Sequence, residues 1–285
     1  MDLPDTFADD LYDFAFCPES CYERLVDLAN PEPWGEGNRV LKNYLLFSFK
    51  RAVQLTKRDH ATAAAPSALP IVFDEGLCLF NTGLYTCRYE TVYALFEPNT
   101  REDARQRWFL KGFFKESDPA LLSFECLPCR VHFAEDPSEL VFDYRLPIRS
   151  NIDHVLGDER NLTRIPESLR GEENSLLLRR AFEGAVVEAA RRAAANYTLA
   201  VPQFYNGRIQ LLLPLCLTGD KPELALTIQR EDGFYSARTC LTLDMAYNNA
   251  RLTAVRSPPG SSAASSRPAR ARPAADSLKK GLALP

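Results

Sequence analysis

Hydrophobic spacing divides the chain into a helical beginning, a strand-rich middle and a mixed C-terminal part. In residues 7–30, apolar side chains recur every three or four positions, which predicts two short helices separated near Pro18. The same spacing over residues 36–58, interleaved with Lys and Arg, predicts a longer amphipathic helix. An Ala- and Pro-rich stretch, residues 61–70, interrupts the pattern and predicts a loop.

From residue 71 the period becomes that of β-strands. Short β-branched or aromatic runs bounded by Gly, Pro, Asn or Asp predict six strands: 71–73, 77–81, 91–96, 108–115, 130–133 and 140–146. Helical spacing returns over residues 175–197, where a high Ala content favours a helix. Three strands and a short helix are expected to follow, at 208–215, 224–230, 234–241 and 243–252.

Short turns between successive strands favour antiparallel pairing. The sequence therefore predicts an α+β fold, in which a mostly antiparallel β-sheet packs with the Ala-rich helix and the N-terminal helices as a single domain. No internal repeat is found.

The last 29 residues differ from the rest in composition. Residues 257–285 contain no aromatic residue, five basic residues and one acid, so they carry a net charge of +4 and are expected to be a disordered basic tail rich in Ser, Pro and Ala. The whole chain of 285 residues carries −4, which leaves −8 for the expected folded domain, residues 1–256. An acidic body argues against broad electrostatic binding and favours a local site for any anionic ligand.

The N-terminal region and the apolar runs indicate a compartment. Acidic residues stand where a secretory signal would be basic, and no run approaches the ~18 apolar residues of a membrane span. We therefore expect a cytoplasmic protein without membrane contact, with its eight cysteines mostly buried as reduced thiols.

Standard catalytic and metal-binding motifs are absent from the sequence. There is no GxSxG, GxGxxG or GxxxxGK[ST], and no cofactor is indicated. Cys126 and Cys129 form a CxxC pair, but only His132 lies near, so a four-ligand zinc site is not expected. Asp153 and His154 are adjacent, and the imidazole is either a hydrogen-bonded turn residue or a general base oriented by the carboxylate.

Polar side chains follow several apolar strands. Asn81 and Thr82 come at the end of one predicted strand. Gln203 precedes a turn, and Gln210 lies within the predicted strand that follows that turn. Lys111 shares a strand face with aromatic neighbours. Lys111 either protects a sheet edge from aggregation, or it binds a nucleic-acid phosphate while the neighbouring bases stack on the aromatic side chains.

The final helix has a polar face. Helical offsets of three and four place Asp244, Tyr247, Asn248 and Arg251 together. Such a face is either solvated or lines a pocket, where Arg251 could bind a phosphate or carboxylate through two hydrogen bonds.

Several of these segments resemble a known family. The blocks are FNTGLYTCRYETVYALFEPN (80–99), RWFLKGFFKESD (107–118), YRLPIRSNIDHVL (144–156), VPQFYNGRIQLLLPLCL (201–217) and CLTLDMAYNNARL (240–252). In order and spacing they are similar to the domain-of-unknown-function 3825 family, and the likeness covers about residues 25–254. Relatives occur beside or fused to predicted RNA-binding modules of cold-shock-like and LOTUS type, which implies a role in RNA metabolism. No such module is visible in this sequence.

Three functions are consistent with these patterns. The first is binding of RNA or a nucleotide in a polar pocket, with these expected ligand-binding residues: Asn81, Thr82, Lys111, Gln203, Gln210, Tyr247, Asn249 and Arg251. The second is a hydrolase or phosphoryl-transfer enzyme acting on a nucleotide or RNA end, with Asp153, His154 and Asp244 as catalytic candidates. The third is a non-catalytic protein-interaction domain whose polar loops contact a partner.

Overall fold

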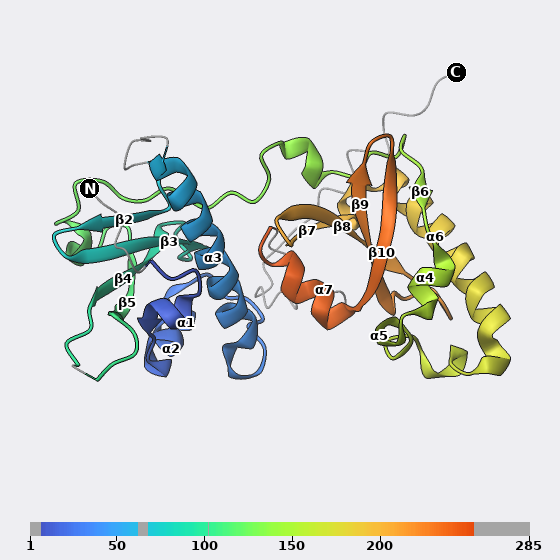
Figure 1. Cartoon of the computed structure of the whole chain (residues 1–285), viewed down its shortest axis with the longest axis horizontal. Coiled ribbons are helices and arrows are strands. Elements are labelled where there is room, and N and C mark those ends of the chain that lie inside the picture. Colours follow the sequence, from blue (N-terminus) through green and yellow to red (C-terminus); the bar gives the residue numbers. More distant parts are fainter. Residues whose placement is uncertain (1–6, 62–67, 102, 254–285) are drawn as a thin grey trace, which may run out of the picture.

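The computed structural model describes residues 7–61, 68–101 and 103–253, and its strands form two five-stranded sheets that lie side by side (Figure 1). We call residues 7–129 the first lobe, residues 130–140 the connecting segment and residues 141–253 the second lobe. The predicted α+β class and mostly antiparallel pairing are confirmed, and the strands are divided between two sheets instead of one.

The first lobe has apolar packing on both faces of its sheet. Its elements are α1 (Leu11–Phe14), β1 (Ala15–Phe16), α2 (Glu19–Leu28), α3 (Arg39–Ala61), β2 (Ile71–Asp74), β3 (Leu77–Tyr85), β4 (Thr91–Pro98) and β5 (Trp108–Lys115). On one face, the ring of Phe49 in α3 meets that of Phe80 in β3 edge-on, with centroids 5.4 Å apart. On the other face, Leu79 and Leu95 pack against Phe124.

The second lobe is packed fully on one face only. Its elements are β6 (Ile148–Arg149), α4 (Ile152–Gly157), α5 (Glu159–Leu162), α6 (Ser175–Ala195), β7 (Val201–Tyr205), β8 (Arg208–Leu215), β9 (Leu224–Glu231), β10 (Phe234–Thr242) and α7 (Leu243–Ala250). Phe182 of the Ala-rich helix α6 is buried in a core with Leu213 of β8. On the opposite face, Ala246 of α7 packs near Leu212 in a small apolar cluster that includes Ala225 and Leu241, and polar side chains lie beside this cluster.

Both lobes follow the same topology, although the sequence shows no internal repeat. In each, a two-residue strand precedes helices and a four-stranded antiparallel meander. That short strand then pairs in parallel with the last strand of the meander, β1 with β5 and β6 with β10. The sheet orders β1-β5-β4-β3-β2 and β6-β10-β9-β8-β7 are therefore equivalent.

Two predicted strands are wrong. Residues 130–133 form no strand, and residues 140–146 contain the end of the 3-10 helix η4 (Pro137–Leu140) followed by turns. Val131 and Phe142 are nevertheless buried, one in each main core, so these apolar positions anchor a connecting chain. The backbone there binds side chains instead of a neighbouring strand, as where Arg51 Nε donates to the carbonyl of His132 at 3.2 Å.

Several short elements have no counterpart in the sequence prediction. These are the edge strands β1 and β6, the strand β7, and the helices α4 and α5. None of the described helices is long and apolar enough to span a membrane. The predicted basic tail, residues 257–285, lies outside the described residues.

Candidate functional site

The uncovered face of the second sheet forms a polar cavity of about 680 Å³, which we call the sheet cavity. Side chains alternate along each strand, so the residues that do not enter the core beneath α6 point into this space. Cross-strand pairing places Gln203 of β7 opposite Gln210 of β8, and Thr239 of β10 opposite Thr227 of β9. Residues of α5 and α7 border the cavity on two sides.

A chain of side-chain amides crosses the floor of the sheet cavity. Asn249 Nδ2 donates to Gln203 Oε1 at 3.0 Å, Gln203 Nε2 donates to Gln210 Oε1 at 2.8 Å, and Gln210 Nε2 donates to Gln229 Oε1 at 3.3 Å. Gln229 Nε2 then donates to a carboxylate oxygen of Glu231 at 3.2 Å. An ionised carboxylate only accepts hydrogen bonds, so it fixes the direction of the whole chain.

Four arginines line the same cavity. Arg164 donates to the carbonyl of Cys240 at 2.5 Å, and Arg238 pairs with Glu231 at 2.5 Å. The guanidinium groups of Arg160 and Arg208 make no hydrogen bond or ion pair with any described residue. Guanidinium groups bind phosphate or carboxylate oxygens through parallel N–H donors, so these two are available for an anionic ligand.

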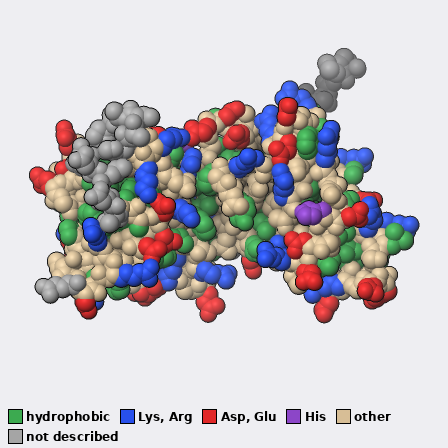
Figure 2. Space-filling view, in the orientation of Figure 1, with side chains coloured by type: hydrophobic (Ala, Val, Ile, Leu, Met, Phe, Trp, Pro, Cys, Tyr) green, Lys and Arg blue, Asp and Glu red, His purple; other side chains and the backbone are tan. Residues whose placement is uncertain are grey.

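The polar face continues beyond the sheet cavity towards β6. Arg238 also lines a second cavity of about 350 Å³ together with His154 and Phe234. Arg149 of β6 lies over the Phe234 ring, 4.3 Å from its centroid. On the face of the molecule shown in Figure 2, acidic and basic side chains are mixed.

Three of the expected ligand-binding residues lie together in the sheet cavity. Gln203 and Gln210 are 2% and 9% exposed, and Asn249 reaches them from α7.

Asn81, Thr82 and Lys111 belong to the first sheet and do not line the sheet cavity. Asn81 Nδ2 donates to the carbonyl of Pro128 at 2.8 Å, and its Oδ1 accepts from the backbone N–H of Gly83. Thr82 Oγ1 donates to the carbonyl of Val92. Both side chains satisfy the backbone at a bulge in β3. Lys111 is exposed on β5 and lies 3.4 Å from a carboxylate oxygen of Glu97.

Arg251 is held between the lobes. Its side chain is 4% exposed, and it donates to both carboxylate oxygens of Glu32, at 2.5 and 2.8 Å. The guanidinium also lies 4.3 Å from the ring centroid of Tyr44. Tyr247 is half-buried against the first core, and burial raises the pKa of its hydroxyl. The expected phosphate contact of Arg251 would therefore require breaking a buried ion pair.

The three catalytic candidates do not share a cavity. Asp153 pairs with Arg179 of α6, while His154 lines the second cavity. Asp244 is exposed in the first turn of α7 and lines neither of the two cavities on this face.

The described residues include no group of three or more His, Cys, Asp or Glu side chains that could hold a metal ion. In the CxxC pair, burial raises the pKa of both Cys126 and Cys129, which favours their protonated forms. The Sγ atom of Cys129 lies 3.0 Å from the carbonyl oxygen of Ala68.

The four cavity arginines and Gln229 are not among the residues predicted from the sequence. The arginines come from α5 or its C-terminal side, from β8 and from β10, and no local spacing groups them. Gln229 had a detectable signal, because it alternates with Thr227 and Glu231 on a strand whose other face carries Leu224, Leu226 and Ile228 in the core.

Comparison with known proteins gives one result. No curated protein and no solved structure matches this chain. The model of the domain of unknown function DUF3825 matches residues 25–257, which is most of the chain, and the protein therefore belongs to the DUF3825 family.

Proposed function

We propose that the protein binds single-stranded RNA, or a nucleotide derived from it, on the open face of the second sheet. The observation that carries this proposal is the sheet cavity itself, where two arginines without ionic partners stand beside a buried chain of amides. This combination offers cations for phosphate and fixed hydrogen-bonding groups for a base.

The phosphate contacts are assigned to Arg160 and Arg208. Both guanidinium groups are exposed, and neither forms an ion pair with a described residue, although Asp158 also lines the cavity. Arg164 and Arg238 have partners, and they help to orient the site through Cys240 and Glu231.

The base contacts are assigned to the amide chain. Each glutamine uses one N–H and one oxygen lone pair within the chain, which leaves a second N–H and a second lone pair. Because neighbouring amides hold them in place, these remaining groups are preorganised to meet the edge of a base.

The length of the polar face favours a strand of RNA over a single nucleotide. Five strands at about 4.8 Å spacing make a face about 19 Å across. Exposed Tyr205 stands on β7 at one edge, and Phe234, with Arg149 above it, stands on β10 near the other. Aromatic rings on a sheet surface stack unpaired bases in many single-strand binders. A cytoplasmic location is part of the same proposal.

The test is binding of fluorescently labelled single-stranded RNA of about ten nucleotides, followed by anisotropy and compared with AMP and GMP as competitors. The double variant Arg160→Gln/Arg208→Gln is expected to bind at least tenfold more weakly. Its plot of log affinity against log salt should be shallower by about 1.4, at about 0.7 per phosphate contact on a single strand.

A matched control removes the same charge from the opposite side of the lobe. Arg180 and Arg191 are exposed on α6, which covers the other face of the second sheet. The variant Arg180→Gln/Arg191→Gln should bind as the wild type does. Equal losses in both double variants would show a general charge effect, and absence of RNA and nucleotide binding at low salt would refute the proposal. Capture of a protein partner without RNA binding would favour the interaction-domain alternative.

A further inference from the structure

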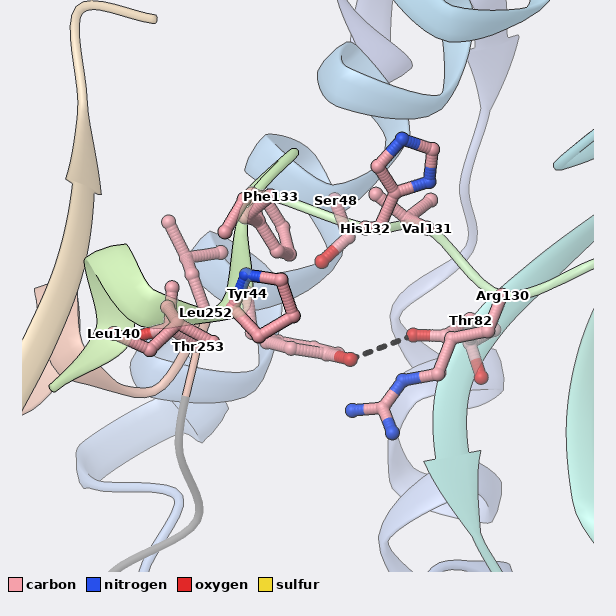
Figure 3. A pocket seen from close by; sticks show the side chains of 13 residues that line it. Tyr44, Ser48, Thr82, Arg130, Val131, His132, Phe133, Leu140, Leu252 and Thr253 are labelled. Atoms are coloured by element: carbon pink, nitrogen blue, oxygen red, sulfur yellow. Dashed lines mark hydrogen bonds between the residues drawn. The ribbon is translucent and has the colours of Figure 1, made fainter. Parts of the chain in front are cut away.

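A separate cavity of about 280 Å³ lies between the two lobes, and we call it the inter-lobe cavity (Figure 3). Its walls come from α3, β3, the connecting segment and the residues that follow α7. It shares no lining residue with the sheet cavity. Its volume is near the lower end of ligand sites, about 300 Å³, and so suits a small molecule.

An unsatisfied hydroxyl group faces the inter-lobe cavity. Ser48 is 2% exposed, and its Oγ atom makes no hydrogen bond of normal length with a described residue, although it lies close to the Tyr44 hydroxyl. One helical turn earlier, Tyr44 donates its hydroxyl hydrogen to the carbonyl of Thr82 at 2.8 Å (Figure 3). A buried polar group without a partner costs about 1–3 kcal/mol, which points to a group supplied from outside the chain.

A cation stands beside these hydroxyl groups. Arg130 lies with its guanidinium 5.7 Å from the ring centroid of Tyr85 and makes no hydrogen bond or ion pair with a described residue. A Cβ atom built on Gly83 would come within 2.7 Å of the Tyr44 hydroxyl and 3.4 Å of Arg130 Nε, so the hydroxyl and the guanidinium converge above this glycine.

The remaining walls are apolar or uncharged apart from His132. The apolar wall includes Val131, Phe133, Leu140 and Leu252, and no Asp or Glu is present among the described lining residues. His132 is exposed and lies 3.7 Å from Glu135. The cavity thus combines one available cation, one unsatisfied hydroxyl and an apolar surface.

We propose that the inter-lobe cavity binds a small organic anion, a carboxylate or phosphate group carried on an apolar body. Arg130 pairs with the anionic group, Ser48 Oγ donates a hydrogen bond to it, and the apolar body lies against Phe133 and Leu252. This site is independent of RNA binding, because none of its residues is assigned to the sheet cavity.

The test compares benzoate, phenyl phosphate and the neutral benzyl alcohol by saturation-transfer NMR and by thermal stabilisation at millimolar concentration. The wild-type protein is expected to bind at least one of the two anions at least tenfold more tightly than benzyl alcohol, and the preferred anion distinguishes the carboxylate from the phosphate source. A ligand that binds only the folded state raises its stability in proportion to ln(1 + [L]/Kd).

Two variants assign the binding to this cavity. Arg130→Met should lose at least tenfold in anion affinity, whereas Arg180→Met, which removes an exposed arginine of α6 outside the proposed sites, should not. Ser48→Ala should weaken anion binding about threefold or more without lowering the Tm of the unliganded protein. Anion binding that is no tighter than benzyl alcohol binding, or that is unchanged in both Arg130→Met and Ser48→Ala, would show that the cavity holds solvent only and would overturn the proposal.

Discussion

Replacing Arg251 by Met is expected to produce one of the largest losses of stability available from a single polar substitution in this protein. The guanidinium is 4% exposed and donates to both oxygens of Glu32, whose side chain is 11% exposed. It also lies 5.4 Å from the ring centroid of Trp34. Methionine has a similar length and no charge, so the substitution leaves the carboxylate of Glu32 buried without its cation.

The magnitude follows from this burial. Removing one partner of a buried ion pair costs about 3–5 kcal/mol, because the remaining charge is left without compensation. At about 2–4 °C per kcal/mol for a protein of this size, the Tm should fall by the order of 10 °C. The double variant Arg251→Met/Glu32→Gln removes both charges and should be more stable than the sum of the two single losses predicts, by about 1–3 kcal/mol.

The assay is urea unfolding followed by tryptophan fluorescence and by far-ultraviolet circular dichroism. Both tryptophans, Trp34 and Trp108, are in the first lobe, whereas circular dichroism reports on both lobes. If residues 1–256 form one domain, as we propose, the two signals should change together in the wild type. The control variant Lys111→Met breaks an exposed pair with Glu97 and should cost less than about 1 kcal/mol.

Two results would refute this reasoning. A loss below about 1 kcal/mol in Arg251→Met would show that the pair is solvated, since exposed pairs contribute that little. A double variant whose loss equals the sum of the single losses would show that Arg251 and Glu32 do not interact. Separate fluorescence and circular-dichroism transitions in the wild type would instead contradict the single-domain proposal.

Three further predictions test local features. Gly83→Ala should cost at least about 1 kcal/mol more than Gly207→Ala in urea unfolding. Both glycines have positive φ, where a side chain costs about 1–2 kcal/mol, but only at Gly83 would the new Cβ atom meet a neighbour. Equal losses would contradict the close contact. Gln210→Leu should cost about 1–3 kcal/mol by leaving two buried amides partly unpaired, whereas Gln54→Leu on the exposed side of α3 should stay within about 0.5 kcal/mol. Burial raises the pKa of Cys240 from 9.0 to about 12. The thiol therefore ionises at lower pH in the unfolded state, so the free energy of unfolding falls between pH 9 and 12 by about 1.4 kcal/mol per pH unit. Unfolding measured against pH should show a smaller slope in Cys240→Ala.

Strong periodicity made the main elements predictable. The expected helix at 175–197 corresponds to α6 (Ser175–Ala195), and the strand expected at 108–115 has the same bounds as β5. The connecting segment was mispredicted because Val131 and Phe133 have the alternation of a strand, yet each is used singly to anchor the chain. Spacing detects apolar positions, but it does not show whether a neighbouring strand is present to pair with them.

The site was predictable only where its residues lie close in sequence. Gln203 and Gln210 flank a single turn and were found, whereas the cavity arginines come from separate elements. Whether an arginine is available also depends on distant residues. The partner of the Arg251 guanidinium is 219 residues away in sequence, while the guanidinium of Arg160 makes no hydrogen bond or ion pair with a described residue. This distinction is invisible in local sequence and decides which arginine can bind a ligand.

The two lobes provide an internal comparison for the sheet cavity, because they share one topology but carry side chains of different polarity on the corresponding sheet face. In the first lobe that face carries Leu79 and Leu95 beneath Phe124, and each such side chain contributes about 1.5–3 kcal/mol when fully buried. In the second lobe it carries the chain of buried amides, whose hydrogen bonds contribute only about 0.5–1.5 kcal/mol each. Folding stability alone would favour apolar side chains on this face. The polar face therefore supports the ligand binding that we propose for the sheet cavity.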